Sequence, residues 1–395
     1  MQMLRRARIV GILFTLLLCM AIPGHASSKA QISQAVDNAN LVTLYGNVHP
    51  LAQAKFDQGA APGSLAMKHM LLLLKRDRAS EQALEAAVAA QHNPLSPNYH
   101  KWLTPKQFHS SFGVADQDVT VIASWLTSQG FSDVTLSAGG TILEFSGTAS
   151  VVRSAFHTDI HQYKVSGVSH WANATNPKVP AAIAPAVNGV VSLNNFERKS
   201  MRKDMGVFNY SKKTGWQKGS TAAQTVTEAN PNSTGSRSRS VKPNYTAVTS
   251  SGDTYRAVGP ADFGTVYNVT PLWNAGIDGT GQEIAIVGRS AITEGDIDQF
   301  RSAFGLPATK LKTVLAGDMP DHTSSEAESL LDIEWSGAIA KNATIDYVVA
   351  ASTDTTDGID LASLYAVDNN VAPILSVSYG QCELGLGTTG NAFYN

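Results

Sequence analysis

Two carboxylates, Glu328 and Asp332, stand four residues apart in residues 325–343, where apolar residues recur at helical spacing. Residues four apart lie on the same face of a helix. Two carboxyl groups held that close cannot both ionise easily, so the pair can take up and return a proton in acid medium. The alternative is an acidic helix face exposed to solvent, to which Glu326 and Glu334 would also belong.

Two stretches of sequence resemble a known family. Residues 328–343 read ESLLDIEWSGAIAKNA, and residues 96–108 read SPNYHKWLTPKQF. The stretch at 328–343 is similar to the serine-carboxyl peptidases of the sedolisin and kumamolisin family. The stretch at 96–108 resembles the pro-kumamolisin activation domain of the same family. The resemblance implies the zymogen of an acid-acting endopeptidase with a subtilisin-like fold, whose substrates are polypeptides.

The resemblance also implies roles for individual residues. Glu328 matches the family's general base, which takes the serine proton, and Asp332 matches the acid that orients and supports that base. A carboxylate base suits acid medium, because imidazole would already be protonated there. Ser378, Tyr379 and Gly380 are similar to the segment that lines the substrate cleft, whose extended backbone can pair with a substrate strand.

The chain also departs from the family pattern. Many members have Trp where Tyr379 stands, and some have a further acidic residue where this chain has Gly288 or Arg289. The family's nucleophile lies in a Gly-Thr-Ser motif and its oxyanion-stabilising Asp in a Gly-Asp-Ser-like turn. Neither motif occurs between Gly380 and Asn395. General-base catalysis needs both a nucleophile and an oxyanion donor.

We therefore expect a fragment of a longer precursor that is inactive as it stands. The family's calcium site is C-terminal and also missing, so we expect no metal or other cofactor in this chain, although calcium is expected in a full-length member. Loss of residues 1–26 would leave Cys382 as the only cysteine, which excludes an internal disulfide. Cys382 is then either buried or paired with a cysteine outside this sequence.

The first segment has the features of a secretory signal. Arg5, Arg6 and Arg8 precede an apolar run over residues 9–22, and small residues flank His25. This predicts a signal peptide at residues 1–26 and a secreted protein, with no membrane association after cleavage. A membrane anchor is the weaker alternative, because the run is short for a bilayer span.

The remainder divides into three regions. With 43% apolar and 16% charged residues, the 395-residue chain is typical of globular proteins. Residues 41–196 mix helical and strand patterns, which predicts an α+β domain, ferredoxin-like by the resemblance. Residues 199–256 are rich in Ser, Thr, Gly, Asn and Lys, which predicts a flexible linker that holds the activation cleavage site. Residues 257–395 alternate strands and helices, which predicts an α/β domain with a mostly parallel sheet, subtilisin-like by the resemblance and incomplete at the C-terminus.

The individual elements follow from hydrophobic periodicity and capping residues. In residues 41–196 the predicted strands are 65–74, 141–146 and 159–165, and the predicted helices are 81–91, one that opens at Thr104-Pro105, and 116–129. In residues 257–395 the predicted strands are 282–287, 310–315, 344–350 and 373–379, and the predicted helices are 293–304, 325–340 and 357–368. Functional groups are expected near the carboxyl ends of the parallel strands.

Basic and acidic side chains are distributed unequally between the two parts of the chain. Residues 27–245 carry 21 basic and 13 acidic side chains, whereas residues 246–395 carry 6 and 19. Opposite charges favour docking of the activation domain on the peptidase part near neutral pH and weaken it as carboxylates protonate. The alternative is that this difference in charge is only a drift in amino-acid composition along the chain. The acidic excess argues against nucleic acid as a partner of residues 246–395.

Two functions of other classes remain open. Residues 41–196 could act without catalysis, as a peptidase inhibitor or a folding chaperone. A metal-binding function would use histidines such as His157, His161 and His170. These residues show no accompanying set of ligands beyond a possible i, i+4 pair, so no metal site is expected.

Overall fold

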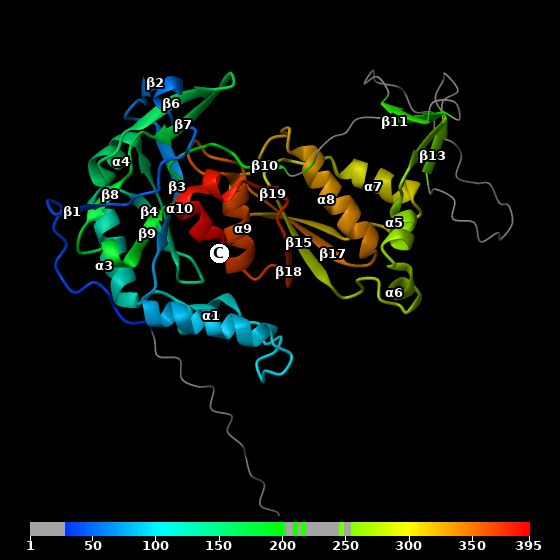
Figure 1. Ribbon diagram of the computed structural model, residues 1–395, viewed down its shortest axis with the longest axis horizontal. Helices are drawn as coiled ribbons and strands as arrows, with labels where there is room; N and C mark the ends of the chain where they lie inside the picture. The colour runs from blue at the N-terminus through cyan, green and yellow to red at the C-terminus, as the bar shows by residue number, and fades with distance from the viewer. Residues whose placement is uncertain (1–27, 201, 203–207, 212–214, 219–244, 249–253) are drawn as a thin grey trace, which may run out of the picture.

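The computed structural model describes residues 28–200, 202, 208–211, 215–218, 245–248 and 254–395. We refer to residues 28–196 as the N-terminal unit and to residues 258–395 as the C-terminal unit (Figure 1). The predicted signal peptide lies outside the described residues, as does much of the predicted linker at 199–256. The strands described within that interval are β10 (Lys199–Ser200), β11 (Phe208–Ser211), β12 (Gly215–Lys218), β13 (Tyr245–Val248) and β14 (Thr254–Ala257).

The N-terminal unit mixes helices and antiparallel strands, as predicted. A four-stranded sheet has the order β4-β5-β3-β9, a three-stranded sheet the order β2-β6-β7, and β1 pairs with β8. The elements are β1 (Leu41–Thr43), a 3-10 turn (Ala54–Phe56), β2 (Asp57–Ala60), β3 (Ala66–Leu74), α1 (Arg78–His92), α2 (Pro105–Phe112), α3 (Asp116–Ser128), β4 (Ser132–Leu136), β5 (Ile142–Thr148), α4 (Ala149–Phe156), β6 (Ile160–Val165), β7 (Val168–Asn173), β8 (Lys178–Pro180), a second 3-10 turn (Ala184–Ala186) and β9 (Val187–Val190).

Local signals set the helix starts in this unit. The Thr104 side chain accepts a hydrogen bond from the backbone N–H of Gln107, and Gln107 reaches back to the backbone N–H of Thr104. This capping box satisfies two amides that the first helical turn leaves without partners, and Pro105 fits the first position because its missing N–H is not needed there. Thr104 and Pro105 therefore start α2 as predicted.

Strand β3 joins the two units because both of its faces are buried. Met70, Leu72 and Leu74 pack in the core of the N-terminal unit. Leu71 and Leu73 point the other way, into a cluster shared with Ile142, Ala350 and Leu361. Successive side chains of a strand alternate between faces, so burial of both faces produces a continuous apolar run. The unbroken apolar run at 70–74 therefore reflects packing of β3 against both units.

The C-terminal unit is built on a parallel sheet of order β16-β17-β15-β18, which confirms the predicted strand direction. Its elements are α5 (Pro260–Val266), α6 (Thr270–Asn274), β15 (Glu283–Gly288), α7 (Glu294–Ala303), β16 (Leu311–Leu315), α8 (Glu326–Ile339), β17 (Thr344–Val349), α9 (Gly358–Asp368), β18 (Ile374–Ser376), β19 (Tyr379–Gly380) and α10 (Glu383–Tyr394). Helices α7 and α8 pack on one face of the sheet and α9 on the other. Figure 1 shows α9 and α10 between this sheet and the N-terminal unit.

The strand predicted at 373–379 is shorter than expected. Pairing with β15 covers Ile374 to Ser376, and the chain then turns away. Tyr379 and Gly380 form β19, which pairs with β10 instead of continuing in the parallel sheet. The segments that follow β15, β17 and β18 all leave from the carboxyl edge of the sheet, and they carry Arg289, Asp357 and Ser378.

Within the part of the chain that the structure describes, no helix has the length and apolar character needed to cross a bilayer.

Candidate functional site

Glu328 lies in the first turn of α8 and is buried, with only 4% of its surface exposed. The hydroxyl of Ser200 donates a short hydrogen bond to Glu328 Oε2, and Arg202 Nε lies 3.7 Å from the same oxygen. The positive end of the helix dipole also favours a carboxylate in the first turn. The structure therefore places Glu328 against Ser200 and Arg202, away from bulk solvent.

Asp332 follows one helical turn later and is half-buried. Burial raises the pKa of Asp332, the side chain of Ser378 opposes this rise through a hydrogen bond, and the charge of Glu328 adds to it. Its Oδ2 atom is buried and has no hydrogen-bond partner among the described residues. The two carboxyl groups thus lie close enough to influence each other, and Asp332 can hold a proton to higher pH than an exposed aspartate.

The other two carboxylates of α8 point elsewhere. Glu326 accepts hydrogen bonds from the backbone N–H and hydroxyl of Thr293, both at 2.9 Å, and lies 3.0 Å from His322. Thr293 is the residue just before α7, and its side chain bonds to Glu326 and not to the α7 backbone. Burial, followed by the charge of Asp296, raises the pKa of Glu334 to about 7. The four carboxylates therefore do not form one solvated face.

The three residues predicted to bind substrate occupy different environments. The backbones of Tyr379 and Gly380 pair antiparallel with those of Ser200 and Lys199. The Tyr379 side chain is 5% exposed and packs in the core below the Arg289 guanidinium, whose carbon lies 4.9 Å from the ring centroid. Tyr379 can therefore offer a peptide its backbone but not its ring. Ser378 lies beside Asp332.

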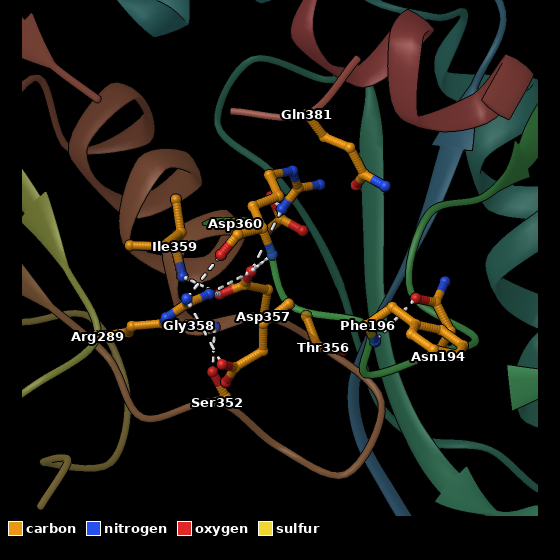
Figure 2. Close-up of polar contacts among 12 residues, drawn as sticks. Asn194, Phe196, Arg289, Ser352, Thr356, Asp357, Gly358, Ile359, Asp360 and Gln381 are labelled. Carbon is orange, nitrogen blue, oxygen red and sulfur yellow. Dashed lines mark hydrogen bonds and ion pairs between the residues drawn. The ribbon is translucent and has the colours of Figure 1, made fainter. Parts of the chain in front are cut away.

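Sequence reasoning missed a buried charge cluster next to this strand pair (Figure 2). Arg198 Nη1 lies 2.6 Å from Asp360 Oδ1 and 3.7 Å from Asp357 Oδ2. Arg289 Nη1 lies 2.8 Å from the same Asp357 oxygen. Asp357 also caps α9 by accepting a hydrogen bond from the backbone N–H of Ile359. The sequence signal was limited to Asp357 at a helix start and Arg289 where an acidic residue was expected.

Asp360 is the most enclosed member of the cluster, with 3% of its surface exposed. Burial raises the pKa of Asp360, and the positive charge of Arg198 opposes that rise. The hydroxyl of Tyr394, near the end of α10, donates a 2.5 Å hydrogen bond to Asp360 Oδ1. The Tyr394 ring centroid lies 4.7 Å from the Arg198 guanidinium carbon. Arg198 is the only cation paired with Asp360 in the described part of the chain.

The histidines considered as metal ligands have other surroundings. His161 pairs with Asp57 at 2.8 Å, and the His170 ring stacks on Phe196 with centroids 4.2 Å apart. His157 holds a left-handed backbone conformation at the end of α4. The described residues contain no group of three or more His, Cys, Asp or Glu side chains placed to hold a metal ion.

Cys382 is exposed and is not in a disulfide.

His49 lies at the contact between the two units. Its ring stacks on Phe196 with centroids 4.2 Å apart, and its Nε2 lies 3.3 Å from Gln381 Nε2. Burial, then the charges of His170 and Arg198, lower the pKa of His49 to about 4. Unfolded histidine titrates near pH 6.5, so the unfolded chain binds this proton first. His49 should therefore remove up to about 3 kcal/mol of stability as the pH falls from about 6.5 to 4.

We accordingly expect His49→Phe to reduce the loss of stability over this pH range. Phenylalanine keeps the stack on Phe196 but cannot take up a proton. The free energy of unfolding should be measured in urea at pH 6.5 and pH 4 for the parent and the variant. His92→Phe changes an exposed histidine and serves as the matched control. A variant that loses as much stability as the parent would contradict the assignment.

Comparison with known proteins gives a consistent result. Residues 53–196 match the family described as the pro-kumamolisin activation domain. The chain is 26% identical over 331 residues to sedolisin from Pseudomonas sp. (strain 101), which covers 82% of this chain and 49% of the relative. It is 28% identical over 349 residues to kumamolisin from Bacillus sp. (strain MN-32), covering 86% and 55%. It is 25% identical over 379 residues to xanthomonalisin from Xanthomonas sp. (strain T-22), covering 92% and 42%.

The chain spans about half the length of these curated relatives. Each similarity extends over more than four fifths of this chain, so it includes both units and not the activation domain alone. The matched domain lies in the N-terminal unit, and the paired carboxylates lie in the C-terminal unit. Residues 53–196 thus match a pro-kumamolisin activation domain, and most of the chain is similar to peptidases of the sedolisin family.

Proposed function

We propose that this chain is part of the zymogen of a secreted, acid-acting serine-type endopeptidase that hydrolyses polypeptides. One observation carries the proposal. Buried Glu328, with Asp332 one turn later, faces a peptide segment that pairs with Tyr379 and Gly380. A general base must lie within hydrogen-bond reach of the proton that it takes. The hydroxyl of Ser200 already makes such a contact with Glu328.

In the proposed mechanism Glu328 accepts the proton of the nucleophilic hydroxyl. Asp332 acts through Glu328: its raised pKa allows it to remain partly protonated in acid medium and to share a proton with its neighbour. The backbones of Tyr379 and Gly380 hold the substrate as an added strand, and Ser378 positions Asp332. The nucleophile and the oxyanion donor belong to a longer precursor. Calcium is expected in such a full-length member.

The sequence of this chain contains neither Gly-Thr-Ser nor Gly-Asp-Ser. We therefore propose that the 395 residues do not hydrolyse peptides. The segment after the activation domain acts as an internal inhibitor in this proposal, because Lys199 and Ser200 fill the strand position that a substrate would take. Residues 27–245 carry 21 basic and 13 acidic side chains, and residues 246–395 carry 6 and 19. These opposite charges favour the closed form near neutral pH.

The proposal is tested with a full-length precursor that contains the serine motif. After a shift to acid pH, the protein should digest a denatured protein substrate at about pH 3–5 and lose activity toward pH 7. Release of acid-soluble peptides measures the rate. The 395-residue chain, assayed in parallel, should release none. Absence of digestion by the full-length protein at every pH would overturn the peptidase assignment.

A further inference from the structure

The backbone of Arg198 is held on both sides by side chains of the C-terminal unit. Its N–H donates a 3.0 Å hydrogen bond to Asp357 Oδ2, and its carbonyl accepts a 2.7 Å hydrogen bond from Arg289 Nη2. Arg289 and Asp357 are themselves joined by two hydrogen bonds, at 2.8 and 3.0 Å, which fixes the donor and the acceptor in place (Figure 2). Every non-proline residue offers the same backbone groups, so this clamp can hold a peptide of almost any sequence.

The side chain of Arg198 is recognised separately. Asp360 lies 2.6 Å from Nη1, and the Tyr394 ring covers the guanidinium group. Asp360 and Tyr394 also come from the C-terminal unit and are joined to each other by the 2.5 Å hydrogen bond. The whole pocket therefore belongs to the part of the molecule that would remain after removal of the activation domain.

The two carboxylates differ in what happens when Arg198 leaves. Asp357 keeps Arg289 as its cation, at 2.8 Å. Asp360 keeps no cation, because Arg198 is its only paired cation among the described residues. A buried carboxylate without a partner is strongly unfavourable, and a guanidinium restores a charge-assisted hydrogen bond and stacks on an aromatic ring. The vacated pocket would thus favour a basic side chain over a neutral one of the same shape.

The position of the pocket relative to the strand pair defines which substrate side chain the pocket would bind. Lys199 and Ser200 pair with Gly380 and Tyr379, and the hydroxyl of Ser200 reaches Glu328. Arg198 is two residues before Ser200. A substrate bound in the same register would present to the pocket the side chain that lies two residues before the one beside Glu328.

We propose that Asp360, together with Asp357, Arg289 and Tyr394, forms a substrate subsite that selects an arginine side chain in an extended peptide. This inference rests on the proposed peptidase function and adds a substrate preference to it. The segment with Arg198 then occupies the subsite of its own protein as a substrate mimic. Asp360, Asp357 and Arg289 are buried, and Tyr394, with 39% of its surface exposed, covers the pocket on its solvent side.

The test uses the 395-residue chain with Arg198→Ala, which empties the pocket. The probe is a fluorescent peptide, Phe-Glu-Arg-Lys-Ser, that copies residues 196–200, and the matched probe carries citrulline in place of arginine. Citrulline has nearly the same shape but no charge. At pH 7 we expect the arginine peptide to bind at least about tenfold more tightly by fluorescence anisotropy, as a charge-assisted hydrogen bond would give. Adding Asp360→Asn to this variant should remove most of the difference.

Equal affinities of the two peptides would overturn the subsite. If residues 198–200 keep both peptides out, a second measurement decides, because it does not depend on peptide binding. N-ethylguanidinium should raise the melting temperature of the Arg198→Ala chain, whereas the neutral N-ethylurea should not, because only the cation can pair with Asp360. Equal effects of the two compounds would also overturn the proposal.

A failure of the subsite can be distinguished from a failure of the proposed peptidase function. An active full-length enzyme that cleaves arginine and citrulline peptides equally well would overturn the subsite and leave the peptidase function intact. Selective arginine binding by a protein whose full-length form digests nothing would support the subsite and overturn the peptidase function.

Discussion

Replacing Glu328 with glutamine in the full-length precursor is expected to lower kcat by about 10²–10⁴-fold, the usual contribution of a general base. Glutamine keeps the size of the side chain but cannot accept a proton from the attacking hydroxyl. Glu328 is buried and accepts a hydrogen bond from the hydroxyl of Ser200, which is the kind of contact that the proposed role needs. Asp332→Asn should lower kcat in the same direction, because an amide cannot share a proton with Glu328.

The measurement needs a control for folding and for self-activation. Each variant should be activated by the same external protease, so that a defect in self-cleavage does not appear as a defect in turnover. Glu326→Gln is the matched control, because Glu326 lies on the same helix but bonds to Thr293 and His322. It should retain turnover close to that of the parent. An active Glu328→Gln enzyme would refute the assigned role.

Replacing Arg198 with alanine is expected to cost about 3–5 kcal/mol of stability, because it removes one partner of a buried ion pair. Asp360 would be left as a buried carboxylate without a cation, and the backbone clamp would hold a residue with no side chain in the pocket. The free energy of unfolding in urea at pH 7 measures the effect. The loss should be smaller at pH 4, where Asp360 can take up a proton and become neutral in the emptied pocket.

The ion pair of Arg153 with Asp159 gives a matched control, since nearly half of each side chain is exposed. Arg153→Ala should cost no more than about 1 kcal/mol, as expected for a pair screened by solvent. Replacing both Arg198 and Asp360 with leucine should recover much of the stability, because no buried charge is then left unpaired. A cost for Arg198→Ala as small as that of the control would show that the buried pair does not hold the units together.

The sequence predicted the features that depend on near neighbours. Helix α8 was expected because apolar residues recur at helical spacing, and the interaction between Glu328 and Asp332 follows from one turn of that helix. Thr104 and Pro105 start α2 through contacts within four residues. The alternation of strands and helices after residue 257 predicted a parallel sheet, because a crossover helix returns the chain in the same direction.

Long-range pairings could not be predicted in this way. Arg198 and Asp360 are 162 residues apart, and no local pattern in either segment indicates the other. The segment with Tyr379 was expected to pair with substrate through its backbone, and the burial of the Tyr379 ring in the core could not be predicted from local sequence. The apolar residues of β3 were visible in the sequence, whereas their division between two packing surfaces was not.

By itself the sequence determined the elements, the resemblance to a peptidase family and the carboxylate pair, because spacing along one helix or strand fixes which side chains share a face. Only the tertiary structure decided what lies opposite Glu328 and which cation neutralises Asp360. Those contacts exist because docking of the two units brings residues 197–200 onto the carboxyl edge of the parallel sheet.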